Sequence, residues 1–159
     1  MSETLSTVPL AATVTPVNRD KAVEELNDLL RGELSACETY RQALDKLSDY
    51  GQRQQLLDCL ASHEARVSKL RQRISQLGGT PVTTSGTWGA FARLVEGGAK
   101  LFGESAAISA LEEGEDYGLE QYREADDLDV ATRDIVQRDL LPAQIKTHAS
   151  ISGLKKSFN

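Results

Sequence analysis

A stripe of apolar residues runs along the first predicted helix and is interrupted by one glutamate. The helix is expected from about Arg19 to Leu47, with Asn18 as its N-cap. Spacings of four and three residues alternate along the stripe, as in a helix packed in a bundle. The stripe consists of Leu26, Leu30, Glu33, Cys37, Tyr40, Leu44 and Leu47. Glu33 should therefore point into the core, where a carboxylate needs a partner, a proton or a metal ion.

The second predicted helix has the same pattern, and here the interruption is a histidine. The helix is expected from about Gly51 to Leu77. Two glycines and Pro81 follow directly, and this combination is typical of a helix end. The stripe consists of Leu56, Leu60, His63, Val67, Leu70, Ile74 and Leu77.

Two more helices are expected after a long connection over residues 78–104. The third begins near Ser105 as N-cap, and its apolar face consists of Ile108, Leu111, Glu115, Leu119 and Tyr122. The fourth begins near Asp129 as N-cap and ends near Lys155. Pro142 should kink this helix or divide it, because proline lacks a backbone N–H. The late apolar face consists of Ile151, Leu154 and Phe158, with His148 beside it.

Together these elements predict an all-α fold, an up-down four-helix bundle of two helical hairpins joined by a long crossover. This is the layout of ferritin-like bundles. Residues 1–17 are expected to form a flexible N-terminal tail, and residues 18–159 the bundle. Within the connection, Trp88 to Val95 predicts a short extra helix. We interpret it as a cap over the bundle; a helix that binds a membrane surface or a partner is the alternative.

One segment occurs twice, once in the first helix and once in the third. Residues 32–43 and 114–125 are identical at six of twelve positions, and the shared residues are Gly, Glu, Glu, Tyr, Arg and Ala. About one identity would be expected by chance in so short a window, so we interpret the segment as an internal repeat. The repeat places Glu115 on the third helix where Glu33 lies on the first.

Composition and charge narrow the classes of function. The net charge of −6 disfavours binding to nucleic acid or to an anionic membrane, since such domains present a basic face. No apolar run is long enough to span a membrane, and the N-terminus does not resemble a signal peptide. Cys37 and Cys59 are too few for a disulfide scaffold, so we expect buried, reduced thiols in a cytoplasmic protein.

Each predicted helix brings one candidate metal ligand to the centre of the bundle. In metal-binding bundles, inward carboxylates and histidines from facing helices hold the ion. The candidates here are Glu33, His63, Glu115 and His148. Such a set suits one ion of iron, manganese or zinc. Glu112 and Glu64 are additional candidate ligands.

Two tyrosines follow the repeated glutamates at a distance of two helical turns. Tyr40 and Tyr122 therefore lie on the same faces as Glu33 and Glu115. They are expected either to donate hydrogen bonds across the bundle, including to a ligand carboxylate, or to fill the core as amphipathic side chains.

The ligand set is incomplete for a two-metal site. The full pattern has Glu-x-x-His on two of the helices, but Leu60 and Ile145 stand where those glutamates would be. In the other register on the second helix, His63-x-x-Arg66, an arginine would stand among the ligands. The alternative is a buried Glu–His network without metal, or glutamates that take a proton or pair with Arg31, Arg41 or Arg123.

The repeated segments resemble the ferritin-like superfamily. Gly-Glu-x-x-Ala-x-x-x-Tyr at residues 32–40 is similar to the first-helix motif of rubrerythrin-type proteins, and residues 114–122 are similar to their third-helix motif. Residues 27–158 resemble more closely an uncharacterised bacterial ferritin-like family, a domain of unknown function described as a four-helix bundle. That resemblance rests on residues 26–29, 77–81 and 107–116. It implies a ferritin-like fold and, by the rubrerythrin motif, metal roles for the two repeated glutamates and the two histidines.

Three functions are open at this point. The incomplete ligand set favours a non-catalytic or degenerate-site bundle that acts through association, expected as a homodimer. The four candidate ligands favour a metal-binding protein with redox or peroxide-related chemistry. The small residues at Gly97, Gly98 and Gly114 suggest a third function, a pocket for a small molecule or lipid in the bundle core.

Overall fold

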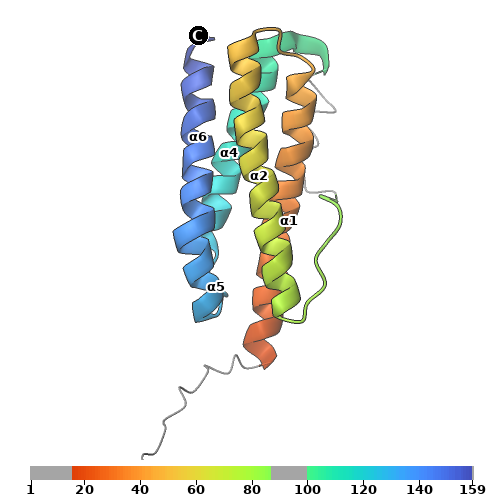
Figure 1. The fold of residues 1–159 in the computed structure, drawn as a ribbon, viewed down its shortest axis with the longest axis vertical. Coiled ribbons are helices and arrows are strands. Elements are labelled where there is room, and N and C mark those ends of the chain that lie inside the picture. The colour runs from red at the N-terminus through yellow and green to blue at the C-terminus, as the bar shows by residue number, and fades with distance from the viewer. Residues whose placement is uncertain (1–15, 87–99, 159) are drawn as a thin grey trace, which may run out of the picture.

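The chain folds into long helices packed side by side (Figure 1). The computed structural model describes residues 16–86 and 100–158. The elements in chain order are α1 (Pro16–Leu44), α2 (Tyr50–Gln76), α4 (Lys100–Glu124), α5 (Val130–Ile135), the π-helical turn η2 (Val136–Leu140) and α6 (Leu141–Lys156). No strand occurs in this part of the chain. The predicted all-α class is therefore confirmed.

The helices pack as two hairpins. α1 packs against α2, α4 packs against α6, and α1 against α4 joins the two pairs. α1 and α4 run in opposite directions. At one end of this pair, Ser48 donates its N–H and hydroxyl to Glu104. At the other end, Glu25 accepts the backbone N–H groups of Asp126 and Asp127.

The connection after α2 returns along α1 as far as it is described. The side chain of Asn27 on α1 donates to the carbonyl of Thr80 at 3.1 Å and accepts from the N–H of Val82 at 2.9 Å. The predicted extra helix at residues 88–95 and the glycines at 97 and 98 lie outside the described residues. The predicted N-terminal tail lies outside them up to residue 15.

The helix ends differ from the prediction by a few residues, for local reasons. α1 begins at Pro16, before the predicted start, because a proline in the first turn lacks only an N–H that has no helical partner there. α4 begins at Lys100, before the predicted N-cap Ser105, and is kinked at Gly103, where a φ of 79° favours glycine. Asp129 caps α5 as predicted, and its Oδ1 accepts two backbone N–H groups at 3.1 and 3.2 Å.

Pro142 does not divide the last helical segment, which was one of the two predicted outcomes. The segment stays helical from Val130 to Lys156, and it widens into the π turn of η2 directly before the proline. Pro142 then lies in the first turn of α6. A π turn changes the spacing of the backbone hydrogen bonds, so the helix can continue although proline has no N–H to donate.

The predicted apolar stripes form the core. Seven stripe residues have no exposed surface: Leu30, Leu56, Leu70, Ile74, Ile108, Leu111 and Ile151. Burial of this apolar surface drives the packing of the hairpins. Cys37 and Cys59 are buried and free, as expected. Among the described helices, none has both the length and the apolar character needed to cross a membrane.

Candidate functional site

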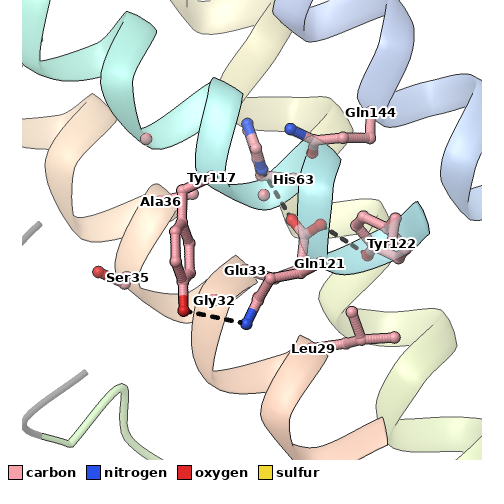
Figure 2. A pocket seen from close by; sticks show the side chains of 12 residues that line it. Leu29, Gly32, Glu33, Ser35, Ala36, His63, Tyr117, Gln121, Tyr122 and Gln144 are labelled. Carbon is pink, nitrogen blue, oxygen red and sulfur yellow. Dashed lines mark hydrogen bonds and ion pairs between the residues drawn. The ribbon is translucent and has the colours of Figure 1, made fainter. Parts of the chain in front are cut away.

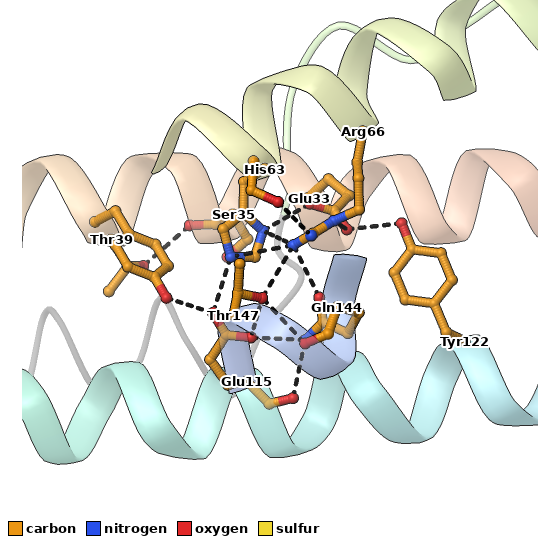
Figure 3. Close-up of polar contacts among 11 residues, drawn as sticks. Glu33, Ser35, Thr39, His63, Arg66, Glu115, Tyr122, Gln144 and Thr147 are labelled. Atoms are coloured by element: carbon orange, nitrogen blue, oxygen red, sulfur yellow. Dashed lines mark hydrogen bonds and ion pairs between the residues drawn. The ribbon is translucent and has the colours of Figure 1, made fainter. Parts of the chain in front are cut away.

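A cluster of charged and polar side chains lies inside the bundle (Figure 3). No member has more than 4% of its surface exposed. Each of the four long helical segments contributes two members, so the site depends on the packing of both hairpins. We call this set the core cluster; it consists of Glu33, Tyr40, His63, Arg66, Glu115, Tyr122, Gln144 and Thr147.

His63 connects the two repeated glutamates. Its Nδ1 lies 2.7 Å from Oε2 of Glu33, and its Nε2 lies 2.9 Å from Oε1 of Glu115. An imidazole that faces a carboxylate with each nitrogen satisfies both when it is doubly protonated, because both nitrogens then donate. The two carboxylates therefore favour the imidazolium form, whereas the contact of Arg66 Nη2 with Nδ1 at 2.7 Å opposes it.

Arg66, one turn along α2, is the second cation of the core cluster. Its Nε donates to Oε1 of Glu33 at 2.7 Å. Its Nη2 donates to Oε1 of Gln144 at 3.0 Å and approaches Thr147 Oγ1 at 3.4 Å. Nη2 also lies 2.7 Å from Nδ1 of His63, so the two cations touch and depend on the carboxylates around them. The guanidinium thus contacts polar groups from α1, α2 and α6.

The repeated tyrosines bond to the glutamates in a crossed pattern. Tyr122 Oη donates to Oε1 of Glu33 at 2.7 Å, and Tyr40 Oη donates to Oε1 of Glu115. Each tyrosine therefore binds the glutamate of the other repeat, which is one of the two roles expected from their spacing. The crossed bonds tie α1 to α4 at two points and restrict both carboxylates.

α6 contributes two neutral groups. Gln144 Nε2 donates to Oε2 of Glu115 at 2.8 Å and to its carbonyl at 3.1 Å, and Thr147 Oγ1 donates to the same Oε2 at 2.9 Å. Gly118 on α4 leaves room for this approach, since a Cβ at that position would lie 3.0 Å from Gln144 Nε2, a tight contact. Glu115 is therefore held mainly by neutral donors, whereas Glu33 contacts both cations.

Charge explains the direction of the pKa shifts. Burial alone would raise the pKa of Glu33, but the charges of His63 and Arg66 outweigh it and lower that pKa. Burial alone would lower the pKa of His63, but the charge of Glu33 and the hydrogen bonds to both glutamates raise it. Two carboxylates, one guanidinium and one imidazolium sum to zero charge. The core cluster is thus neutral without any added ion.

The buried hydroxyl and thiol groups next to these charges keep their protons. Burial and the carboxylate beside each one raise the pKa values of Tyr40 and Tyr122 well above the ordinary 10.0. Burial and the charge of Glu33 raise the pKa of the Cys37 thiol to about 12. The tyrosines are therefore donors at neutral pH, and Cys37 is an inert thiol.

Three of the four candidate metal ligands meet in the core cluster, and the fourth does not. His148 is partly exposed, and its Nε2 lies 2.6 Å from Oδ1 of Asp116. It follows Thr147 directly, so it points about 100° away from the inward face of α6. The additional candidates are also elsewhere: Glu112 pairs with Lys155, and Glu64 accepts from Arg41 at 2.6 Å near the surface.

Gln144 and Thr147 were not predicted from the sequence, and Arg66 was considered only as an obstacle to a metal site, although two signals pointed to these residues. Arg66 stands three residues after His63, so both lie on one helical face. The inward stripe of α6 continues backwards from its apolar end at spacings of three and four, as Leu154, Ile151, Thr147, Gln144 and Leu140. Of the arginines proposed as partners, Arg31 bonds to Asp28 and Arg41 to Glu64.

The donor set of the core cluster does not fit a metal ion as it stands. His63 uses both ring nitrogens on carboxylates, and the Arg66 guanidinium lies against Glu33 where a cation would bind. A guanidinium is not a metal ligand and repels a second cation. Among the described residues, no group of three or more His, Cys, Asp or Glu side chains has the arrangement of a metal site.

A small cavity lies beside the core cluster between α1 and α4 (Figure 2). Its volume of about 30 Å³ is room for about two water molecules. Small residues of both repeats line it, and Glu33 and His63 lie at its inner side. The small lining residues are Gly32, Ala36, Gly114 and Gly118. The repeated glycine thus leaves a narrow space next to the buried carboxylate.

Comparison with known proteins identifies the family of the chain. A family model described as "Domain of unknown function (DUF2383)" matches residues 21–127, which is more than half of the chain. The matched range includes the repeated glutamates, the repeated tyrosines, His63 and Arg66, and it ends before Gln144. No curated protein and no solved structure matches the chain. The chain therefore belongs to the DUF2383 family of domains of unknown function.

Proposed function

We propose that this protein is a non-catalytic ferritin-like bundle with a degenerate site, which acts in the cytoplasm by association, as a homodimer. The ferritin-like assignment is supported by the layout. α1 and α4 are antiparallel, and the connection from α2 begins by returning along α1, as a long crossover between two hairpins would. The internal repeat on α1 and α4 supports the same arrangement.

One observation carries the non-catalytic assignment: the core cluster satisfies its own polar groups. The only buried side-chain atom without a hydrogen-bond partner in the described part of the chain is Oε1 of Gln52, which is not a member. A site that acts on a substrate or metal needs groups free to bind it. Because the buried groups bind one another, the activity is expected on the outer surface of the bundle.

The second candidate is a metal-binding protein that uses iron, manganese or zinc, with redox or peroxide-related chemistry. The meeting of Glu33, His63 and Glu115 favours it. Arg66 opposes it, since a metal would have to displace the guanidinium from Glu33. The third candidate, a small-molecule or lipid pocket, has less support. The cavity beside the core cluster is about 30 Å³, whereas such pockets are about 300–1,000 Å³.

Metal analysis separates the first candidate from the second. The chain is purified without a metal-affinity tag, loaded in turn with Fe(II), Mn(II) and Zn(II), dialysed and submitted to elemental analysis. Glu33→Ala is the test variant and Glu64→Ala the control, since Glu64 lies near the surface. We expect substoichiometric metal in all three proteins. Stoichiometric metal in the wild type and in Glu64→Ala that is lost in Glu33→Ala would overturn the proposal in favour of the metal-binding candidate.

Solution mass tests the association. Sedimentation equilibrium over a wide range of protein concentration should give about twice the mass of one chain. A monomer at every concentration, with no partner retained by chemical crosslinking in cells, would overturn the associational function.

A further inference from the structure

Six of the eight members of the core cluster occupy the positions at which a two-metal bundle places its ligands. Such bundles use one inward residue on each of two helices and a pair at i and i+3 on each of the other two. Here position 33 lies on α1 and position 115 on α4. The pairs are 63 and 66 on α2, and 144 and 147 on α6. Each of the six side chains forms a hydrogen bond to at least one of the other five (Figure 3).

The chemistry differs at four of the six positions. Glu33 and Glu115 are the carboxylates that the pattern requires. The pair on α2 is His63 and Arg66 in place of Glu and His, and the pair on α6 is Gln144 and Thr147. Gln144 has the shape of a glutamate and already lies within hydrogen-bond distance of Arg66 and Glu115. Two carboxylates are therefore absent, and two cationic side chains are present.

The charges of the two arrangements balance in the same way. In a two-metal site, four carboxylates offset the metal ions. In the core cluster, two carboxylates remain, and one guanidinium together with one imidazolium offsets them. His63 lies between the two carboxylates and Arg66 lies against Glu33, where the metal ions would lie in such a bundle.

We infer that the core cluster is a two-metal carboxylate site in which the side chains of His63 and Arg66 have taken the place of the metal ions. The inference rests on the proposed function, since it explains why a ferritin-like bundle would carry a degenerate site. The backbone positions of the ligands are retained, so substitutions at those four positions should restore metal binding. The metal ions bound would be first-row divalent ions that prefer carboxylate and imidazole donors.

The surroundings of a metal site are still present. Metal ligands are oriented by hydrogen bonds from neighbouring groups. Tyr122 and Tyr40 already donate such bonds to the two glutamates. An ion also needs a path into the bundle. The cavity lined by Gly32 and Gly114 is also lined by Glu33, so it leads to one of the carboxylates. These features are what a metal site requires besides its ligands.

The test restores the missing ligands. The variant H63E/R66H/Q144E/T147H carries four carboxylates and two imidazoles. It is loaded with Co(II), which is detected by its visible absorption and by elemental analysis after dialysis. We expect about two ions per chain and a raised unfolding temperature in the presence of metal. The control H63E/R66Q/Q144E/T147Q has the same carboxylates without imidazoles and should bind Co(II) more weakly.

A single substitution keeps the inference testable if the fourfold variant does not fold. Arg66→His leaves two carboxylates and two histidines, which suit about one ion per chain. A folded Arg66→His that takes up no more Co(II) than the wild type would overturn the inference, as would a folded fourfold variant that binds none. Stoichiometric Co(II) in the wild type would instead overturn the proposed function. The two failures are therefore distinguishable.

Discussion

The two hairpins contribute the same acids to the core cluster but different partners for them. α1 and α4 each bring a glutamate and a tyrosine, and the tyrosines bond in the same crossed manner. α2 brings two cations, His63 and Arg66, whereas α6 brings only an amide and a hydroxyl. The repeated helices are therefore equivalent in the site, and the helices that follow them are not.

The residues that the two hairpins share and the residues that balance the charge of the site are different ones. The glutamates and tyrosines occur in both copies of the internal repeat, so they indicate a shared origin of the two hairpins. The two cations have no counterpart in the second hairpin, and their role is to neutralise the two buried carboxylates. Isolated buried charges are costly, and a paired set tolerates burial only while it is complete. Stability should therefore depend most on the groups that the repeat does not predict.

Removing the guanidinium should have the largest effect. Arg66→Met leaves Glu33 with His63 as its one remaining cationic partner in the core cluster, so the free energy of unfolding should fall by about 3–5 kcal/mol. Urea unfolding followed by circular dichroism measures it. Arg71→Met, at an exposed position of the same helix, is the control and should change little. If the two variants were equally stable, the role of Arg66 as counter-ion would be wrong.

Removing the tyrosine hydroxyls tests the equivalence of the repeated helices. Tyr40→Phe and Tyr122→Phe each remove one donor to a buried carboxylate, so each should cost about 2 kcal/mol. The two costs should be similar, as measured by urea unfolding. A large cost at one position and none at the other would show that the repeat is not symmetric in energy.

The neutral donor on α6 should matter less than the cation on α2. Thr147→Val removes one of the donors to Oε2 of Glu115, and Gln144 still donates to that oxygen, so the cost should be about 1 kcal/mol. Unfolding temperatures are sufficient to rank the stability loss of Thr147→Val against that of Arg66→Met. A loss as large as that of Arg66→Met would mean that the hairpins contribute equally to the neutralisation of the carboxylates.

The smallest effect is expected at the second histidine. His148 is partly exposed and pairs with Asp116, so His148→Asn should change stability by less than about 0.5 kcal/mol. Metal content should also be unchanged. A loss of more than 2 kcal/mol, about that of a tyrosine variant, would place His148 in the core against its position in the structure.

Much of the fold follows from the spacing of apolar residues. The stripes with Leu30 and Leu70 predicted the buried faces of α1 and α2, because the regular turn of a helix fixes the direction in which each side chain points. Helix ends were less predictable. Gly103 and Pro142 change the backbone in ways that depend on packing, and the sequence did not distinguish a π turn from a kink.

The candidate site was predictable where a charged residue interrupted a stripe. Glu33, His63 and Glu115 were identified in that way. Arg66 was not, because a long side chain next to a stripe can also extend to solvent, and only the position of Glu33 across the bundle brings it inward. His148 was taken for a ligand by chemistry alone, although the stripe of α6 passes through Thr147 instead.

The dependence of stability on pH tests the central claim, that His63 is a buried cation between two carboxylates. The folded pKa of His63 is raised, so its contribution is fully present below the ordinary value of 6.5 and is lost as pH rises through the folded pKa. The folded pKa of Glu33 is lowered, so its contribution is present above the ordinary value of 4.5 and is lost as pH falls through the folded pKa. Stability should therefore be greatest between these two values.

The decisive measurement is the free energy of unfolding of the wild type and of His63→Gln from about pH 5 to about pH 8. This range lies below the ordinary pKa of 9.0 of the two cysteine thiols, whose raised folded pKa values would lower the stability of both proteins at higher pH. We predict that wild-type stability falls as pH rises above 6.5, and that His63→Gln lacks this fall. A wild type whose stability is flat or rises over that range, or a variant with the same fall, would contradict a charged His63 at the centre of the bundle.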